Sequence, residues 1–180
     1  LISTYEANSL YQKIKSKGYK YNHPFTPPLY VSVSMIALIY IPFSGNAIYN
    51  PYLILFIFIL IWISDTMSYF FGSLFGRTSL KIEASPNKTW EGFIGGLFCS
   101  ILFSYVSFNF IQEIFPLWKT IVLGFIVPIF GLFGDIVQSK IKRRAGVKDS
   151  GNIIPGHGGL FDRLDSAIGN SFIVLIITIL

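Results

Sequence analysis

The fold class follows from the residues between Tyr52 and Phe71, which read YLILFIFILIWISDTMSYFF. Asp65 is the only charged side chain in this stretch, and an apolar run of roughly 20 residues has the length of a helix that spans a bilayer. The chain contains other such segments, the last too short to span as given. They lie at Leu29–Ile48, Tyr52–Phe71, Phe93–Ile111, Leu117–Phe133 and Ala167–Leu180. We therefore predict an all-α, polytopic integral membrane protein with about five transmembrane segments.

The composition excludes an ordinary soluble domain. The 180 residues are 52% hydrophobic and 13% charged, whereas soluble domains carry about 25% charged residues. The single cysteine, Cys99, lies inside an apolar segment, and no cluster of Cys and His predicts a zinc site. A Gly-x-x-x-x-Gly-Lys motif is absent, which argues against a P-loop fold.

The chain divides into a short lead-in and a longer membrane-embedded domain. Residues 1–28 are predicted to be an amphipathic, basic, cytoplasmic lead-in, and residues 29–180 a transmembrane domain. The chain begins at Leu1 without an initiator methionine, and its last apolar segment runs to Leu180, so we expect the C-terminal part of a longer protein. Pro42 and Pro128 fall inside apolar segments, where kinks are expected.

Basic side chains are unevenly distributed between the connections. If the N-terminal residues are cytoplasmic and each apolar segment crosses the membrane, thirteen of the 14 Lys and Arg residues fall on the cytoplasmic side. Only Lys119 falls on the far side. The positive-inside rule therefore predicts that both long polar connections, residues 72–92 and 134–166, face the cytoplasm. The host membrane would be a bacterial inner membrane or an organelle membrane.

The first group of polar residues follows the fourth apolar segment. If its helix continues into the cytoplasm, Asp135, Ser139 and Lys142 fall at i, i+4 and i+7 and share one face. A carboxylate at the membrane boundary, followed by a hydroxyl and an ammonium group, suits a polyphosphate bound with a metal ion.

A glycine-rich loop and a second acidic group come next. Gly151, Gly156, Gly158 and Gly159 let the backbone approach a ligand closely. Asp162 and Asp165, at i and i+3, are expected on one helical face, with Arg163 pointing elsewhere, where it could reach a phosphate oxygen. Taken singly, the two aspartates could instead offset a helix dipole, and His157 could be a surface residue in a turn.

This choice of residue types fits chemistry between two phosphates. Two anions meet only if their charge is compensated, and Asp side chains hold Mg²⁺ while Lys and Arg neutralise the remaining charge. A phosphate nucleophile is already ionised at neutral pH, so the reaction needs alignment and charge stabilisation more than a strong base. A site rich in Asp, Lys and Arg meets these needs.

The connection at residues 72–92 adds a second polar group. Asp65 lies within an apolar helix, where an ionisable residue is costly and indicates function. Trp90 could be an interfacial anchor or contact a base, and Glu91 could be a helix-start charge or orient Lys88. Gly72 and Gly76, with the glycines at 92, 95 and 96, are expected to serve close helix packing.

The stretch from Ser139 to Asp165 resembles the signature of the phosphatidate cytidylyltransferases, also called CDP-diacylglycerol synthases. In that signature Ser, Lys-Arg, four residues, Lys-Asp, Pro-x-His-Gly-Gly and Asp-Arg-x-Asp follow one another. The fixed positions are filled by Ser139, Lys142-Arg143, Lys148-Asp149, Pro155, His157-Gly158-Gly159, Asp162-Arg163 and Asp165. Residues 65–92 also resemble the family's second block, with Asn87 where Lys is commoner and Ser68 where Ala is commoner.

The resemblance implies a nucleotidyltransferase of phospholipid biosynthesis, with residues 29–180 as its catalytic domain. CMP would pass from CTP to phosphatidic acid, giving CDP-diacylglycerol and pyrophosphate, with Mg²⁺ required and a second cation an open alternative. It further implies a homodimer whose site opens to both cytosol and bilayer; nucleic acid is not an expected partner. The expected catalytic residues are Asp135, Lys142, Asp162, Arg163 and Asp165, of which Asp135, Asp162 and Asp165 would hold the metal. The expected substrate-binding residues are Ser139, Arg143, Lys148, Asp149, His157, Gly158, Gly159, Asp65, Arg77, Ser85 and Lys88.

Two alternatives stay open at this point. A related enzyme could transfer CMP to another lipid phosphate, such as an isoprenoid ether lipid. A non-catalytic membrane scaffold or transporter component could use the same helices, but it would have no reason to keep the full signature. Alcohol phosphotransferases are disfavoured because their Asp-Gly-x-x-Ala-Arg helix is absent.

Overall fold

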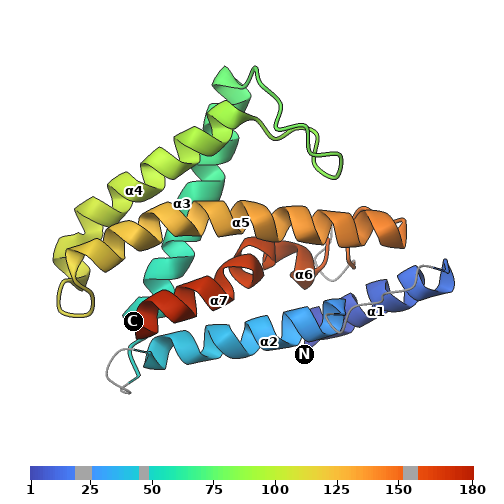
Figure 1. Ribbon diagram of the computed structural model, residues 1–180, viewed down its shortest axis with the longest axis horizontal. Helices are drawn as coiled ribbons and strands as arrows, with labels where there is room; N and C mark the ends of the chain where they lie inside the picture. The colour runs from blue at the N-terminus through green and yellow to red at the C-terminus, as the bar shows by residue number, and fades with distance from the viewer. Residues whose placement is uncertain (19–25, 45–48, 152–157) are drawn as a thin grey trace.

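The computed structural model describes residues 1–18, 26–44, 49–151 and 158–180, and within these ranges it holds helices and no named strand (Figure 1). The elements are α1 (Ile2–Ser16), α2 (Pro27–Tyr40), the 3₁₀ turn η1 (Ile41–Phe43), α3 (Pro51–Phe75), α4 (Trp90–Ile111), α5 (Leu117–Ala145), α6 (Leu160–Arg163) and α7 (Asp165–Ile179). The prediction of an all-α membrane protein is confirmed.

Three of the predicted segments form helices of membrane-spanning length. By length and composition, α3, α4 and α5 are long and apolar enough to cross a bilayer, while α2 with η1 and α7 are shorter apolar helices. The α-helix of the first segment ends at Tyr40 and is followed by η1, which contains Pro42, the position where the sequence predicts a kink. Pro128 lies inside α5, which continues twelve residues beyond the predicted end at Phe133, to Ala145.

Glycines let two pairs of helices approach closely. A Cβ atom built on Gly92 of α4 would lie 2.6 Å from the Ser68 carbonyl oxygen and 3.0 Å from Gly72 Cα on α3, so the expected packing role of these glycines is confirmed. Where α5 crosses α7, a Cβ atom on Gly169 would lie 2.6 Å from Gly134 Cα. The second crossing brings the start of α7 against the residue that precedes Asp135.

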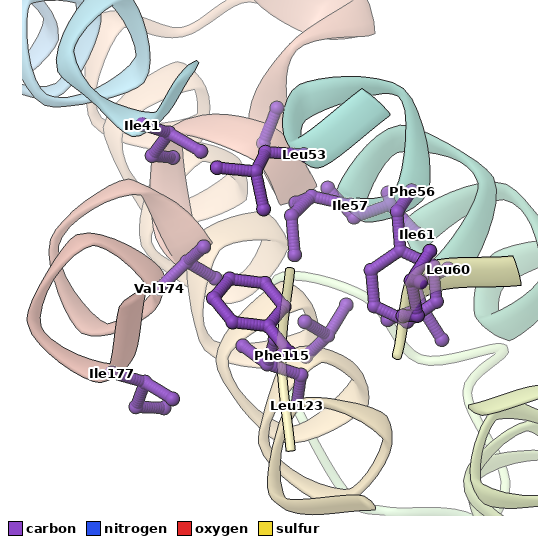
Figure 2. Close-up of a cluster of buried hydrophobic side chains, with 13 residues drawn as sticks. Ile41, Leu53, Phe56, Ile57, Leu60, Ile61, Phe115, Leu123, Val174 and Ile177 are labelled. Carbon is purple, nitrogen blue, oxygen red and sulfur yellow. The ribbon is translucent and has the colours of Figure 1, made fainter. Parts of the chain in front are cut away.

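The main apolar core lies toward the end of the molecule that holds η1 and the α4–α5 connection. Figure 2 shows Phe115 between Val174 of α7 and Ile57 of α3, and all three side chains are buried. Each fully buried side chain of this size contributes about 1.5–3 kcal/mol relative to leaving it exposed. This core fixes α3, α5 and α7 relative to one another and leaves their opposite ends for polar residues.

A second buried cluster holds the N-terminal helix in place. Leu10 and Ile14 of α1 pack with Val31 of α2, Ile141 of α5 and Phe161 of α6. Accordingly, α1 contacts α2, α5 and α6, and Figure 1 shows it beside the C-terminal half of α5. Helix α1, the first described part of the lead-in, is therefore an integral part of the packed structure.

Candidate active site

A pocket of about 490 Å³ opens between α3, the start of α4, α5 and the start of α7. Three carboxylates line it, each from a different helix: Asp65 of α3, Asp135 of α5 and Asp165 of α7. Its other walls include the apolar side chains of Phe93 and Leu132. We call it the acidic pocket.

A helix crossing and local hydrogen bonds determine where the three carboxylates lie. Asp135 follows Gly134, and a Cβ atom on Gly134 would lie 2.6 Å from the Asp165 carbonyl oxygen, so the α5–α7 crossing brings these aspartates together. Ser166 Oγ donates a 3.0 Å hydrogen bond to Asp65 Oδ2. Ser139 Oγ donates to Asp135 Oδ1 at 3.2 Å, which confirms that residues 135 and 139 share a helical face.

Lys88 provides the positive charge that the structure brings to Asp135. Its ammonium group forms an ion pair with Asp135 Oδ2, and both side chains are about a quarter exposed. Lys88 comes from the connection between α3 and α4, where Leu80 N donates to Lys88 O at 2.8 Å and Trp90 N donates to Thr78 O at 3.0 Å. This short backbone pairing carries Lys88 back over the pocket.

Glu91 holds the base of the same connection. Both of its carboxylate oxygens accept from Thr78 N, at 3.1 and 3.2 Å. Of the two roles left open for Glu91, the hydrogen bonds support one at the start of α4 and show no contact with Lys88. Trp90 is half exposed beside it.

A second, basic pocket of about 220 Å³ adjoins the first. Its lining residues come from the α3–α4 connection, the end of α5 and the residues that follow α5. They include Ser85, Ser139, Lys142, Arg143, Lys148 and Asp149. Asn87 lines both pockets, and Lys88 and Ser139, which both contact Asp135, lie on either side of the boundary. Cationic and acidic groups therefore meet at Asp135.

Asp162 ties the glycine-rich loop to the basic pocket. Its Oδ1 accepts from Lys142 Nζ at 2.7 Å, and its Oδ2 accepts from Ser150 N at 2.7 Å, Ser150 Oγ at 2.9 Å and Gly159 N at 3.0 Å. Burial works against ionisation of this carboxyl, but the hydrogen bonds from Lys142, Ser150 and Gly159 outweigh it and lower the pKa of Asp162.

The expectation that Asp162 and Asp165 share one helical face is wrong. The helix breaks at Leu164, whose φ and ψ are −107° and 13°, so Asp162 belongs to α6 and Asp165 is the first residue of α7. As a result Asp162 is directed to Lys142, whereas Asp165 lines the acidic pocket with Asp65 and Asp135. Spacing of i and i+3 fixes a shared face only within one continuous helix.

Comparison with known proteins identifies the family of this chain. A model of the cytidylyltransferase family matches residues 2–180. The chain belongs to the cytidylyltransferase family. Relatives named phosphatidate cytidylyltransferase include one from Staphylococcus saprophyticus, 49% identical over 113 residues, which are 63% of this chain and 44% of the relative. Those from Staphylococcus haemolyticus and Staphylococcus aureus are 43% and 41% identical over 136 residues, which are 76% of this chain and 52% of each relative. The chain spans about half the length of these relatives.

The structure gathers most of the residues predicted from the signature in this member of the cytidylyltransferase family. Asp65, Lys88, Asp135 and Asp165 line the acidic pocket, and the six residues named above line the basic one. Gly158 and Gly159 surround Asp162: Gly158 has φ of +84°, and a Cβ atom there would lie 2.9 Å from Asp162 Oδ2. Arg77 follows α3 and Arg163 ends α6; both are exposed, and neither is among the residues lining these two pockets. His157 lies outside the described residues.

The donor set of the acidic pocket suits Mg²⁺ held jointly with substrate. Within the ranges that the structure describes, no three Asp, Glu, His or Cys side chains form a group that could hold a metal ion by themselves. Mg²⁺ usually takes one or two carboxylates and completes its shell with water and substrate phosphates. Asp135 and Asp165 offer such carboxylates, and Asp135 is paired with the ammonium group of Lys88. Asp162 lies outside the lining of this pocket, and its Oδ2 alone accepts from Ser150 N, Ser150 Oγ and Gly159 N.

Sequence reasoning missed Glu6, the buried carboxylate of α1. It lies 3% exposed on the same face as Ser3 and Leu10, it accepts hydrogen bonds from Leu160 N and Phe161 N, and Ser150 Oγ lies 3.2 Å from its Oε2. An acid on the apolar side of an amphipathic helix was the available signal. Its partners lie about 150 residues away along the chain, so the sequence pattern could not name them.

Proposed function

We propose that this chain forms the catalytic part of a phosphatidate cytidylyltransferase. It would transfer CMP from CTP to phosphatidic acid and give CDP-diacylglycerol and pyrophosphate. The observation that carries the proposal is the pair of adjoining pockets, one basic and one acidic with apolar walls, which share Asn87. Family membership and the names of the relatives support the same reaction.

The basic pocket suits the triphosphate of CTP. Lys142, Arg143 and Lys148 supply positive charge within one small cavity, and Ser85 and Ser139 supply hydroxyl donors. Charge-assisted hydrogen bonds to phosphate oxygens are the strong ones in such a site. Because Lys142 Nζ donates a hydrogen bond to Asp162 Oδ1, that ammonium group is oriented before the nucleotide binds. Arg77, Arg163, His157 and the loop glycines stay proposed substrate-binding or catalytic residues.

The acidic pocket suits the lipid phosphate. It lies among helices of membrane-spanning length, and Phe93, Pro128 and Leu132 give it apolar walls beside its polar groups. A lipid headgroup entering from the bilayer would keep its acyl chains against such walls while its phosphate met Lys88. The positive-inside distribution of Lys and Arg supports a cytoplasmic opening, where CTP is available.

We place the Mg²⁺ ligands at Asp135 and Asp165, with Asp65 nearby. When bound, Mg²⁺ would neutralise charge on the phosphate oxygens and help to align the two substrates. Asp162 would serve the site by orienting Lys142, in keeping with its four hydrogen bonds.

In the proposed reaction a phosphatidate oxygen attacks the α-phosphorus of CTP. The new P–O bond forms as the bond between the α-phosphorus and the bridging oxygen of pyrophosphate breaks, and pyrophosphate leaves with that electron pair. Lys88 would align the attacking phosphate, while Lys142, Arg143 and Lys148 would stabilise the charge that develops on the leaving group. No side chain has to remove a proton, because the nucleophile is already an anion.

Transfer of label from α-³²P-CTP into chloroform-extractable lipid tests the proposal. Purified chain would be incubated with phosphatidic acid micelles and Mg²⁺, and a hybrid in which this chain replaces its matching region of the Staphylococcus haemolyticus relative would be assayed in parallel. Label in lipid that requires both phosphatidate and Mg²⁺ supports the proposal. CTP binding without any transfer by either protein contradicts it.

Replacing Asp135 tests the site itself. We expect Asp135→Asn to lower transfer by about 100-fold, since removing one preorganised charge from such a site typically costs 10²–10³ in rate. Glu113→Gln, an exposed substitution in the α4–α5 connection, is the matched control and should leave transfer unchanged. If folded Asp135→Asn protein keeps full turnover, a scaffold becomes the better explanation.

The choice of acceptor lipid distinguishes a phosphatidate cytidylyltransferase from a related enzyme that transfers CMP to another lipid phosphate. Acyl phosphatidate and a prenyl ether analogue would be compared at equal concentration in the same assay, and we expect the acyl acceptor to be preferred.

We also propose that the protein acts as a homodimer, which light scattering of the detergent-solubilised protein would test.

A further inference from the structure

Glu6 is a buried carboxylate with a full set of partners far away in sequence. The side chain is 3% exposed, and a charged group at such a site is costly unless hydrogen bonds compensate it. Phe161 N donates to Glu6 Oε2 at 2.7 Å, Leu160 N donates to Oε1 at 3.2 Å, and Ser150 Oγ lies 3.2 Å from Oε2. Glu6 therefore joins α1 to both sides of the glycine-rich loop.

The surrounding residues leave room for this carboxylate. A Cβ atom built on Gly159 would lie 2.5 Å from Glu6 Oε1, and one built on Gly151 would lie 2.7 Å from the same oxygen. The absence of side chains at these glycines therefore accommodates Glu6, in addition to any approach of the loop to a ligand. Leu10 and Ile14 of the same helix are fully buried in the second apolar cluster, away from the carboxylate's hydrogen bonds.

A series of polar contacts connects Glu6 to the basic pocket. Ser150 Oγ lies within hydrogen-bonding distance of Glu6 Oε2 and, at 2.9 Å, of Asp162 Oδ2, and its single proton serves one carboxylate at a time. Asp162 Oδ1 then accepts from Lys142 Nζ, which lines the basic pocket. Three contacts connect α1 to a cation that faces the proposed triphosphate site.

We propose that Glu6 is a positioning residue for nucleotide binding: it holds Ser150 and the start of α6 so that Asp162 orients Lys142 toward the triphosphate. This inference rests on the proposed function, because it assigns the basic pocket to a nucleoside triphosphate. Glu6 touches no substrate in this scheme and acts only through Ser150, Leu160 and Phe161.

Glu6→Gln is the decisive variant. The amide keeps the volume and one acceptor oxygen, but it places an N–H donor against groups that themselves donate. We expect the KM for CTP to rise about tenfold, with the KM for phosphatidate and kcat changing less than twofold. Glu113→Gln makes the same chemical change at an exposed site and should match the wild type.

A second variant distinguishes a positioning role of Glu6 from a general loss of packing around α1. Leu10→Ala removes packing from α1 without touching the carboxylate, so it should lower the melting temperature and leave the KM for CTP unchanged. If Leu10→Ala raises the KM for CTP as much as Glu6→Gln does, the proposal is overturned. If Glu6→Gln does not accumulate, Ser150→Ala interrupts the same connection and should raise the KM for CTP by itself.

Two readouts keep this test distinct from the test of the reaction. Hydrogen exchange should quicken at the Leu160 and Phe161 amides in Glu6→Gln, and inorganic triphosphate should bind more weakly by calorimetry, whether or not lipid becomes labelled. CTP binding without transfer by both the wild-type chain and the hybrid would reject the proposed function only. Unchanged amide exchange and unchanged triphosphate affinity in Glu6→Gln would reject the role of Glu6.

Discussion

Two aspartates three residues apart, Asp162 and Asp165, illustrate what the surroundings of a side chain decide. Asp162 accepts four hydrogen bonds and is paired with Lys142, whereas Asp165 faces a pocket that already holds two other carboxylates. The first is suited to an organising role, and the second to binding a cation. The break at Leu164 separates these two roles.

The lowered pKa of Asp162 predicts how stability depends on pH. The carboxylate is stabilised in the folded state, so its contribution is fully present above the unfolded value of about 3.9 and is lost as pH falls through the lower folded-state pKa. Asp162→Asn should lose about 1–3 kcal/mol at neutral pH. Thermal unfolding in detergent would measure this, and the difference between wild type and variant should shrink as the pH is lowered below about 4. A difference that stays constant down to pH 3 would contradict the prediction.

At the scale of elements, the site depends on how closely α5 crosses α7. Gly134 and Gly169 meet at this crossing, and Asp135 and Asp165 flank it. The helices themselves follow from local sequence, but their separation depends on two residues that lack a side chain. A small change in this separation alters the distance between two carboxylates of the acidic pocket.

Gly134→Ala should therefore damage both stability and the proposed activity. Its Cβ atom would lie 2.6 Å from the Asp165 carbonyl oxygen and 2.8 Å from Gly169 Cα, so the helices must shift, at a cost of about 1–3 kcal/mol. Gly131→Ala, one turn earlier on α5, is the matched control, because its nearest neighbour is the side-chain nitrogen of Asn170 at 3.3 Å. Unfolding midpoints should fall for Gly134→Ala and change little for Gly131→Ala; equal effects would contradict the argument.

At the scale of the whole molecule, apolar side chains cover much of the outer surface. Trp62 of α3, Phe98 of α4 and Phe125 of α5 are each about half exposed or more, as expected for helices surrounded by lipid. The polar residues gather instead around the α3–α4 connection and the end of α5, where the two pockets lie. We propose that this distribution presents the site at one side of the bilayer.

Cysteine labelling tests that arrangement. In a Cys99→Ser background, Glu83→Cys would report on the α3–α4 connection and Glu113→Cys on the α4–α5 connection; both glutamates are exposed. In right-side-out vesicles a membrane-impermeant maleimide should label position 113 directly and position 83 only after permeabilisation. The reverse pattern would contradict the predicted orientation and the cytoplasmic opening of the site.

The sequence by itself determined the properties that depend on neighbouring residues. Hydropathy over about 20 residues predicted α3, α4 and α5, and helical periodicity predicted that Asp135 and Ser139 share a face. The signature motif led to the family, because its residue types and spacing are read directly from the chain. These inferences needed no knowledge of how the helices pack.

Only the tertiary structure decided which distant groups meet. Asp65, Asp135 and Asp165 come together because α3, α5 and α7 cross at close range, and Lys88 joins them through the fold of a connection. Glu6 reaches residues about 150 positions later because α1 packs against α5 and α6. Contacts of this kind depend on the burial of whole helix faces and on the space left by glycines, and local periodicity carries no information about either.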